Sequence, residues 1–288
     1  MKLISFLHQG NPGYGVVVDS ELVVDLTPVF GPEAPDLKAL IAGDLLSIAA
    51  QAARTETPTL RLSDLELLPV IPNPGAIFCV GLNYSDHVLE TGRALTDVPT
   101  MFLRTAASQV AHHQAIVKPP ESSQLDFEGE IAVIIGRDGR RISEADAWSH
   151  VAGYACYNDA SIRDWQLATT QWTAGKNFWR TGAFGPWMVT ADEIFPGQRL
   201  TLTTRLNGQE VQRATTDHLI HSIPRQIAYI SAFTPLRPGD VIVTGTPGGI
   251  GSKRVPPLFM KAGDTCEVEV DAIGVLRNEI ADESVGYG

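Results

Sequence analysis

Residues 126–136 read DFEGEIAVIIG and set two carboxylates, Glu128 and Glu130, two positions apart on an apolar, β-branched run. Because side chains alternate along a strand, both carboxylates lie on the same face of it. Like charges repel and each carboxylate loses hydration when buried, so such a pair in a core needs a cation between its members; a divalent metal is the simplest candidate. The alternative is the solvent face of an edge strand, where acidic side chains prevent unwanted pairing. This stretch alone is consistent with either.

A third carboxylate follows a second apolar and aromatic run, residues 151–157. Asp159 stands where that strand is expected to end. Three oxygen donors with no Cys or His nearby suit a hard ion such as Mg²⁺, Mn²⁺ or Ca²⁺, and disfavour zinc. Asp159 also suits the start of a helix, since Asn-Asp precedes a segment that would open one, and the two roles can coexist.

The rest of the chain predicts a mainly β, α+β protein. Asn207-Gly208 between two β-type runs is a strong hairpin signal. A proline-rich segment, 67–75, predicts a boundary between a small N-terminal domain, 1–72, and a larger domain, 73–288. Strands are expected at 76–81, 131–136, 200–206, 241–244 and 266–270, and helices at 36–54, 144–150, 162–169 and 224–233.

Charge and cysteine content limit the partners. A net charge of -11 with no basic run opposes binding to nucleic acid or an anionic membrane. The three cysteines are widely separated, which indicates reduced thiols and a cytoplasmic location. The apolar part of the first ten residues is too short for a signal peptide or a membrane span.

An ordered set of motifs extends over residues 76–278. They are CVGLNYSDHVLE (79–90), the acidic stretch, NDASIRD (158–164), GK (175–176), GP (185–186), LNG (206–208), PGDVI (238–242) and TGTP (244–247). The set resembles the fumarylacetoacetate hydrolase superfamily, in its shorter branch of acylpyruvases and 2-hydroxyhepta-2,4-diene-1,7-dioate isomerases. The resemblance implies a mixed β-sandwich roll as catalytic core, a small N-terminal domain and a homodimer.

The same resemblance implies a metal-dependent enzyme that acts on small 2-oxo or 2,4-dioxo acids. Glu128, Glu130 and Asp159 match the metal ligands of the family, with Mg²⁺ or Mn²⁺ as the cofactor and Ca²⁺ as a further possibility. Lys176 takes the place of a cation for the substrate carboxylate or for an oxyanion. Without the resemblance, Lys176 would be an ordinary exposed lysine.

His87 and Glu90 are three positions apart after a strand. On a helical turn this spacing places both on one side, where the carboxylate can orient the imidazole as a general base on water. In similar hydrolases a mobile segment carries this pair over the metal, which would account for the polar stretch 87–100. An ordinary capped surface turn is the structural alternative.

Three further residues are candidates for substrate binding. Arg163 is a second positive group near the predicted metal, although it could equally pair with Asp164 or with a ligand carboxylate. Thr246 lies in TGTPGG, which can present N–H groups and a hydroxyl to an anion. Arg180, with Trp179, departs from the residues common in the family; it either meets a second polar group of the substrate or lies at the dimer surface.

These residues predict a hydrolase that cleaves a C–C bond of a 2,4-dioxo acid such as an acylpyruvate or fumarylpyruvate. Water activated by His87 and Glu90 would attack the distal carbonyl, giving a pyruvate-type acid and a second carboxylic acid. The alternative is a decarboxylase or keto–enol isomerase acting on a 2-oxo dicarboxylic acid of aromatic or sugar-acid catabolism. A third class, a catalytically silent binding protein, is opposed by the complete set of ligands, base and lysine. No phosphate-loop spacing and no nucleophile elbow is present.

Overall fold

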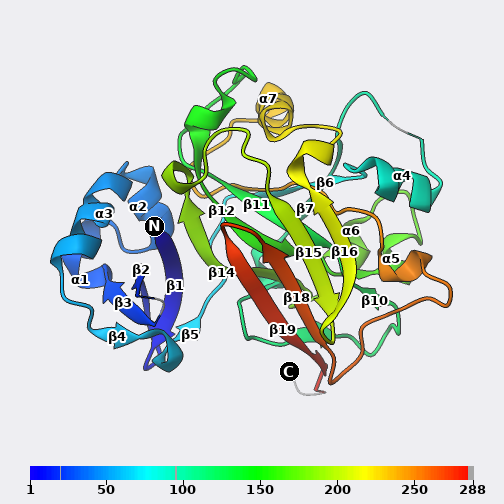
Figure 1. Cartoon of the computed structure of the whole chain (residues 1–288), viewed down its shortest axis with the longest axis horizontal. Helices are drawn as coiled ribbons and strands as arrows, with labels where there is room; N and C mark the ends of the chain where they lie inside the picture. The colour runs from blue at the N-terminus through cyan, green and yellow to red at the C-terminus, as the bar shows by residue number, and fades with distance from the viewer. Residues whose placement is uncertain (20, 95, 285–288) are drawn as a thin grey trace.

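A computed structural model describes residues 1–19, 21–94 and 96–284. The fold is mixed α+β and consists mostly of strands, as the sequence predicts (Figure 1). The α-helices are α1 (Thr27–Phe30), α2 (Leu37–Ala42), α3 (Leu46–Thr55), α4 (Ser85–Thr91), α5 (Arg163–Gln166), α6 (Thr173–Lys176) and α7 (Ile223–Phe233). The strands are β1 (Lys2–His8), β2 (Asn11–Val18), β3 (Leu22–Asp25), β4 (Leu60–Arg61), β5 (Glu66–Leu67), β6 (Ile77–Gly81), β7 (Thr100–Arg104), β8 (Gln109–Val110), β9 (Ile116–Lys118), β10 (Leu125–Asp126), β11 (Gly129–Ile135), β12 (Val151–Asn158), β13 (Ser161–Ile162), β14 (Gly182–Thr190), β15 (Thr201–Leu206), β16 (Gln209–Thr215), β17 (Val241–Val243), β18 (Thr265–Val270) and β19 (Gly274–Asp282).

Two large sheets face each other in the core. The larger runs β4-β3-β2-β1-β14-β12-β11-β17-β6-β7, and β5 and β8 pair with β1 and β14. The smaller runs β16-β15-β18-β19-β9 and packs against β11, β12 and β14 (Figure 1). Apolar side chains of both sheets form one core between them, which is the sandwich that the sequence predicts.

Strand β11 lies inside the larger sheet, between β12 and β17. Its odd-numbered residues, such as Val133, face the core between the sheets, and its even-numbered residues, such as Ala132 and Ile134, face a second core on the other side. Burial of both faces explains why the sequence of this strand is continuously apolar. The acidic pair at its start is therefore not on an exposed edge.

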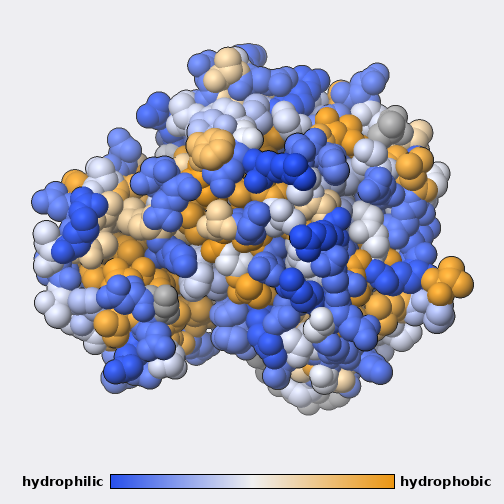
Figure 2. Space-filling model, viewed as in Figure 1, coloured by the Kyte–Doolittle hydropathy of each residue, from blue (hydrophilic) through white to orange (hydrophobic). Residues whose placement is uncertain are grey.

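The N-terminal lobe is joined to the rest of the molecule by strand pairing. Strand β1 is antiparallel to β14, with Lys2 opposite Val189 and Leu3 opposite Met188, so the larger sheet continues from the lobe into the core (Figure 1). On the face shown in Figure 2, hydrophobic residues gather over this lobe and along its junction with the core. The division at residue 72 remains a prediction, because the shared sheet does not by itself separate two domains.

Most predicted elements are found where they were expected. Strands β6, β11, β15, β17 and β18 occupy the five predicted ranges, helices α2 and α3 occupy 36–54, and α7 matches 224–233. Asn207 and Gly208 join β15 to β16 with φ values of 52° and 78°, the geometry of a type I′ hairpin turn. No helix within the described ranges is long and apolar enough to cross a membrane.

Two helix predictions were wrong in extent. Residues 144–150 contain only a short 3₁₀ turn, Ala147–His150, because the Ser143 hydroxyl accepts the Asp146 N–H at 3.2 Å and fixes a turn before β12 begins. Of residues 162–169 only Arg163–Gln166 is helical. A Cβ on Gly175 would lie 2.2 Å from the Gln166 nitrogen, so α6 packs directly on the end of α5.

Candidate metal centre and active site

Three carboxylates meet where β11 begins and β12 ends. These strands are antiparallel with Gly129 opposite Asn158, so Glu128 and Glu130 lie beside Asp159. All three side chains are buried, and one oxygen of each lies within 4.8 Å of the others. A Cβ on Gly129 would lie 2.0 Å from Thr204 Oγ1, so a glycine is required between the two glutamates. The acidic triad predicted from the sequence is brought together.

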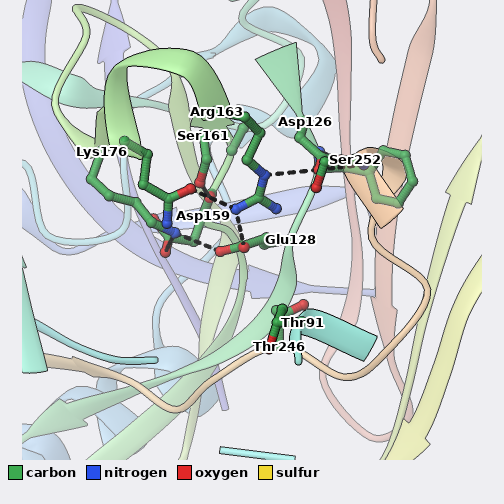
Figure 3. Close-up of polar contacts among 12 residues, drawn as sticks. Thr91, Asp126, Glu128, Asp159, Ser161, Arg163, Lys176, Thr246 and Ser252 are labelled. Carbon is green, nitrogen blue, oxygen red and sulfur yellow. Dashed lines mark hydrogen bonds and ion pairs between the residues drawn. The ribbon is translucent and has the colours of Figure 1, made fainter. Parts of the chain in front are cut away.

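Buried cations pair with the triad, and Figure 3 shows two of them, Lys176 and Arg163, beside Glu128 and Asp159. Lys176 Nζ lies 2.5 Å from Glu128 Oε2 and 2.6 Å from Asp159 Oδ2. Arg163 Nη1 lies 2.7 Å from Glu128 Oε1, so the pairing with a ligand carboxylate considered for Arg163 is the one formed. Arg104 Nη1 lies 2.5 Å from Asp159 Oδ1. The position of Lys176 between two members of the triad shows that it is not an ordinary surface lysine.

The charges around the triad do not balance. Among the described residues, this cluster holds four buried carboxylates, those of the triad and Asp126, and three buried cations, Arg104, Arg163 and Lys176. The cluster therefore has a net charge of -1 when every group is ionised. A divalent cation would change this to +1, which suits an anionic substrate.

The pKa values within the triad are pushed apart. Burial, with repulsion from Asp159 and Glu128, raises the pKa of Glu130 well above its ordinary value. Burial likewise raises the pKa of Asp159, outweighing Lys176 and Arg104. At Glu128 burial acts in the same direction, but Arg163 and Lys176 outweigh it and hold the pKa well below the ordinary range. A buried carboxylate that resists ionisation without a cation is typical of a metal ligand.

The donor set fits a hard divalent cation. It offers three carboxylate oxygens close together and an excess of negative charge, and no thiolate or imidazole of the described residues belongs to it. Glu130 Oε2 accepts the Gly245 N–H at 2.5 Å, which fixes the orientation of this carboxylate. Glu128, Glu130 and Asp159 are therefore the residues that would hold Mg²⁺ or Mn²⁺.

A cavity of about 110 Å³ opens beside the triad. Its apolar wall consists of Leu82, Phe102, Leu167, Trp172 and Ile250. Its polar lining consists of His87, Thr91, Arg93, Glu128, Glu130, Arg163, Gln166, Lys176, Thr246, Ser252 and Lys253. A cavity of about 630 Å³ adjoins it and shares Arg93, Phe102 and Trp172 with it, and one of about 570 Å³ lies elsewhere. Neither is lined by a member of the triad, so the smaller cavity is the candidate active site.

His87 and Glu90 lie on one side of α4, as their spacing predicts. His87 lines the cavity, and its Nδ1 has no hydrogen-bond partner among residues 1–19, 21–94 and 96–284. Glu90 Oε2 lies 3.6 Å from that Nδ1, which is too long for a hydrogen bond. Both Glu90 oxygens instead accept the Gly249 N–H at 3.1 Å. Glu90 therefore holds α4 to the glycine-rich loop.

Two predicted substrate-binding residues have different positions. Thr246 lines the cavity, and its hydroxyl donates to the Gly129 carbonyl at 3.0 Å and accepts from Gln212 at 2.9 Å. Arg180 is half-buried outside the cavity lining, with its guanidinium 5.2 Å from the Trp179 ring. The substrate-binding role of Arg180 remains a prediction to which this geometry gives no support.

Asp126 is a site residue that the sequence analysis quoted without giving it a role. Its Oδ1 accepts the N–H groups of Phe127 and Gly251, and its Oδ2 accepts those of Ser252 and the Arg163 Nε. The last three bonds are each 2.8 Å long. One buried carboxylate thus fixes both Arg163 and the loop that carries Ser252.

Replacement of Asp126 by Asn is expected to loosen both attachments, because an amide nitrogen would face N–H donors. We expect the free energy of unfolding in urea to fall by about 1–3 kcal/mol. We also expect kcat/KM to fall about tenfold to a hundredfold, as for other groups that orient the residues at a metal centre. Asp217→Asn, at an exposed carboxylate 3.5 Å from Arg199, is the control. Two variants indistinguishable in stability and activity would contradict the role given to Asp126.

Comparisons with known proteins agree with this geometry. Residues 76–281 match the family model described as fumarylacetoacetate (FAA) hydrolase C-terminal. The chain belongs to the fumarylacetoacetate hydrolase superfamily, and the family predicted from the motifs is confirmed.

Individual relatives differ in their named reactions. The mitochondrial oxaloacetate tautomerase FAHD2A of Bos taurus is 35% identical, over 97% of this chain and 91% of the relative. The fumarylacetoacetate hydrolase of Exiguobacterium antarcticum has a TM-score of 0.84 at 31% identity, over 98% of this chain and all of that one. The maleylpyruvate hydrolase of Sphingobium sp. SYK-6, solved with manganese(II) and pyruvate, has a TM-score of 0.81 at 28% identity, over 99% and 100% of the two chains. The chain thus shares a superfamily with proteins of different named reactions, so its own reaction is inferred from its site.

Proposed function

We propose that this protein is a divalent-cation-dependent keto–enol tautomerase of a small 2-oxo acid, with oxaloacetate as the first candidate. This is the isomerase alternative of the sequence analysis. Similarity to an oxaloacetate tautomerase over almost the whole chain supports it. The small cavity also supports it, since drug-sized ligands occupy roughly 300–1,000 Å³.

The observation that carries the proposal is the separation of His87 from Glu90. Attack by water requires the carboxylate to orient the imidazole, yet both oxygens of Glu90 accept the Gly249 N–H. His87 borders the cavity, and its buried Nδ1 has no hydrogen-bond partner in the part of the chain that the structure describes, so the imidazole can take part in a single proton transfer. Tautomerisation needs only such transfers and consumes no water.

The residues of the cavity can perform this reaction. His87 would take the proton from carbon 3 of the keto form as the C2–C3 double bond develops, and would then return that proton to the oxygen on carbon 2. Lys176 and Arg163 provide positive charge where that oxygen becomes negative. Phe102, Trp172 and Ile250 form an apolar wall beside these groups. A cation held by the triad would add Lewis acidity at the same oxygen.

The hydrolase predicted from the sequence remains a second candidate. It is favoured by the one-turn spacing of His87 and Glu90 and by the similarity to maleylpyruvate hydrolase. A rotation of the Glu90 side chain away from Gly249 would allow its carboxylate to orient His87 as a general base. A decarboxylase would use the same stabilisation of negative charge on the oxygen of carbon 2 and would differ in the bond that breaks.

Product analysis distinguishes the three reactions. The protein, stripped and then loaded with Mn²⁺ or Mg²⁺, is incubated with oxaloacetate, an acylpyruvate and fumarylpyruvate, and the products are identified by mass spectrometry and ¹³C NMR. We expect accelerated exchange between the enol and keto forms of oxaloacetate with no change of mass. Two acids from a dioxo substrate would establish the hydrolase instead, and carbon dioxide in excess of the metal-only control would establish the decarboxylase.

We infer that the physiological cation is Mg²⁺ or Mn²⁺, since the donor set does not separate them. A homodimer and a cytoplasmic location remain predictions from the sequence. Size-exclusion chromatography with light scattering tests the first, and imaging of the tagged protein in its own cell tests the second.

A further inference from the structure

Two cations at the cavity carry no assigned role. Arg93 follows α4, and Lys253 ends the short 3₁₀ turn Gly251–Lys253; both line the cavity and both are exposed. The other two permanent cations of this cavity, Arg163 and Lys176, form ion pairs with members of the triad. For Arg93 and Lys253 no ion pair with a carboxylate is found within residues 1–19, 21–94 and 96–284.

The Arg93 guanidinium and the backbone that carries Lys253 are each positioned by a contact that does not neutralise the cation. The Arg93 guanidinium lies 5.3 Å from the centre of the Trp172 ring, which also lines the cavity. Stacking on an aromatic ring leaves the N–H edge of a guanidinium available to an anion. Lys253 follows Ser252, whose N–H donates to Asp126 at 2.8 Å, so the backbone that carries Lys253 is anchored in the protein.

The charges indicate a ligand with two anionic ends. With a divalent cation bound, the triad cluster has a charge of +1, which one carboxylate of a 2-oxo acid would balance. Arg93 and Lys253 would then face the rest of the cavity with no protein carboxylate to balance them. A substrate with a neutral tail would leave both unpaired, whereas a short dicarboxylate would pair with them.

We propose that Arg93 and Lys253 bind the distal carboxylate of a 2-oxo dicarboxylate and so select dicarboxylates over monocarboxylates. The assignment rests on the proposed function for the orientation of the substrate, with its oxo acid end at the triad. The two residues belong to separate segments in contact, because Glu90 of α4 accepts the Gly249 N–H from the glycine-rich loop. A dicarboxylate would therefore also connect these two segments across the cavity.

Calorimetric binding of malate and lactate to the Mn²⁺-loaded protein tests the assignment. These non-reacting 2-hydroxy acids share the end that would face the triad and differ in the distal carboxylate. We expect the wild type to bind malate about tenfold more tightly than lactate. Arg93→Met and Lys253→Met should each reduce that preference about threefold, and the double variant should abolish it, while the lactate affinity stays unchanged.

Lys261→Met, at an exposed lysine outside the cavity lining, controls for the loss of one positive charge and should keep the preference. A wild type that binds malate no more tightly than lactate, or a double variant that keeps the preference, would overturn the assignment. The enol–keto assay on the same preparations separates the two proposals. Loss of preference in the double variant of a protein that does not tautomerise oxaloacetate supports this assignment and refutes the proposed function. Turnover of oxaloacetate, together with an unchanged preference for malate in the double variant, supports the proposed function and refutes this assignment.

Discussion

Glu130→Gln is expected to reduce turnover about a thousandfold and to leave the cation-free protein at least as stable as the wild type. Glutamine keeps the shape of the side chain, and its amide oxygen can still accept the Gly245 N–H. It removes one of the three oxygens that would hold the cation. Loss of Lewis acidity worth about 4 kcal/mol corresponds to the thousandfold effect.

The stability part of this prediction has a defined pH dependence. The pKa of Glu130 is raised by burial and by its carboxylate neighbours, so the folded state binds this proton more tightly than the unfolded state. The stability contributed by Glu130 is therefore full below the unfolded pKa, about 4.3, and is lost as the pH rises towards the folded pKa. Glu130→Gln should thus gain stability relative to the wild type as the pH rises above about 4.3.

Urea unfolding in chelator at a series of pH values measures the stability, and calorimetric titration measures the affinity for Mn²⁺. We expect Mn²⁺ affinity to fall at least a hundredfold in Glu130→Gln. A variant that binds Mn²⁺ as the wild type does, or one that is destabilised at neutral pH, would contradict the assignment of Glu130 as a ligand.

Lys176→Met is expected to have the opposite effect on stability. Lys176 is buried between Glu128 and Asp159, so its removal leaves two buried carboxylates without their shared ammonium group. In chelator this should cost about 3–5 kcal/mol of unfolding free energy. Mn²⁺ at about a hundred times its dissociation constant should restore about 2.7 kcal/mol. Turnover should stay about a hundredfold to a thousandfold low, because the donor to the developing oxyanion is absent.

Lys118→Met is the matched control, since Lys118 Nζ pairs with Asp282 at 2.9 Å on the surface. A surface pair contributes at most about 1 kcal/mol. Equal unfolding free energies for the two lysine variants in chelator would refute the buried role of Lys176. Wild-type turnover by Lys176→Met would refute its catalytic role.

The triad could be predicted because its signals are local. Alternation in a strand puts Glu128 and Glu130 on one face, and Asp159 follows an apolar run at a strand end. The antiparallel pairing of β11 with β12 then joins the two signals. The choice between a metal site and an exposed edge was open in the sequence, and the central place of β11 in the sheet decides it.

The partners of the triad could not be predicted in the same way. Arg104 is 55 positions from Asp159 and ends a strand with no distinguishing pattern, so only the packing of the sheet brings it to the site. Arg93 and Lys253 are exposed in a polar stretch and a glycine-rich loop, where single basic residues are common. The role of Arg180 stays a prediction: its departure from the family pattern suggested substrate binding, and its guanidinium lies 5.2 Å from the Trp179 ring.

Stopped-flow absorbance of enol oxaloacetate mixed with the Mn²⁺-loaded protein tests the central claim, that a cation held by the buried triad supports keto–enol exchange. We expect decay of the enol faster than in buffer with Mn²⁺ alone, loss of that acceleration with chelator, recovery when Mn²⁺ is returned, and no acceleration by Glu130→Gln. Decay at the rate of the Mn²⁺ buffer, or acceleration that chelator and Glu130→Gln leave unchanged, would contradict it.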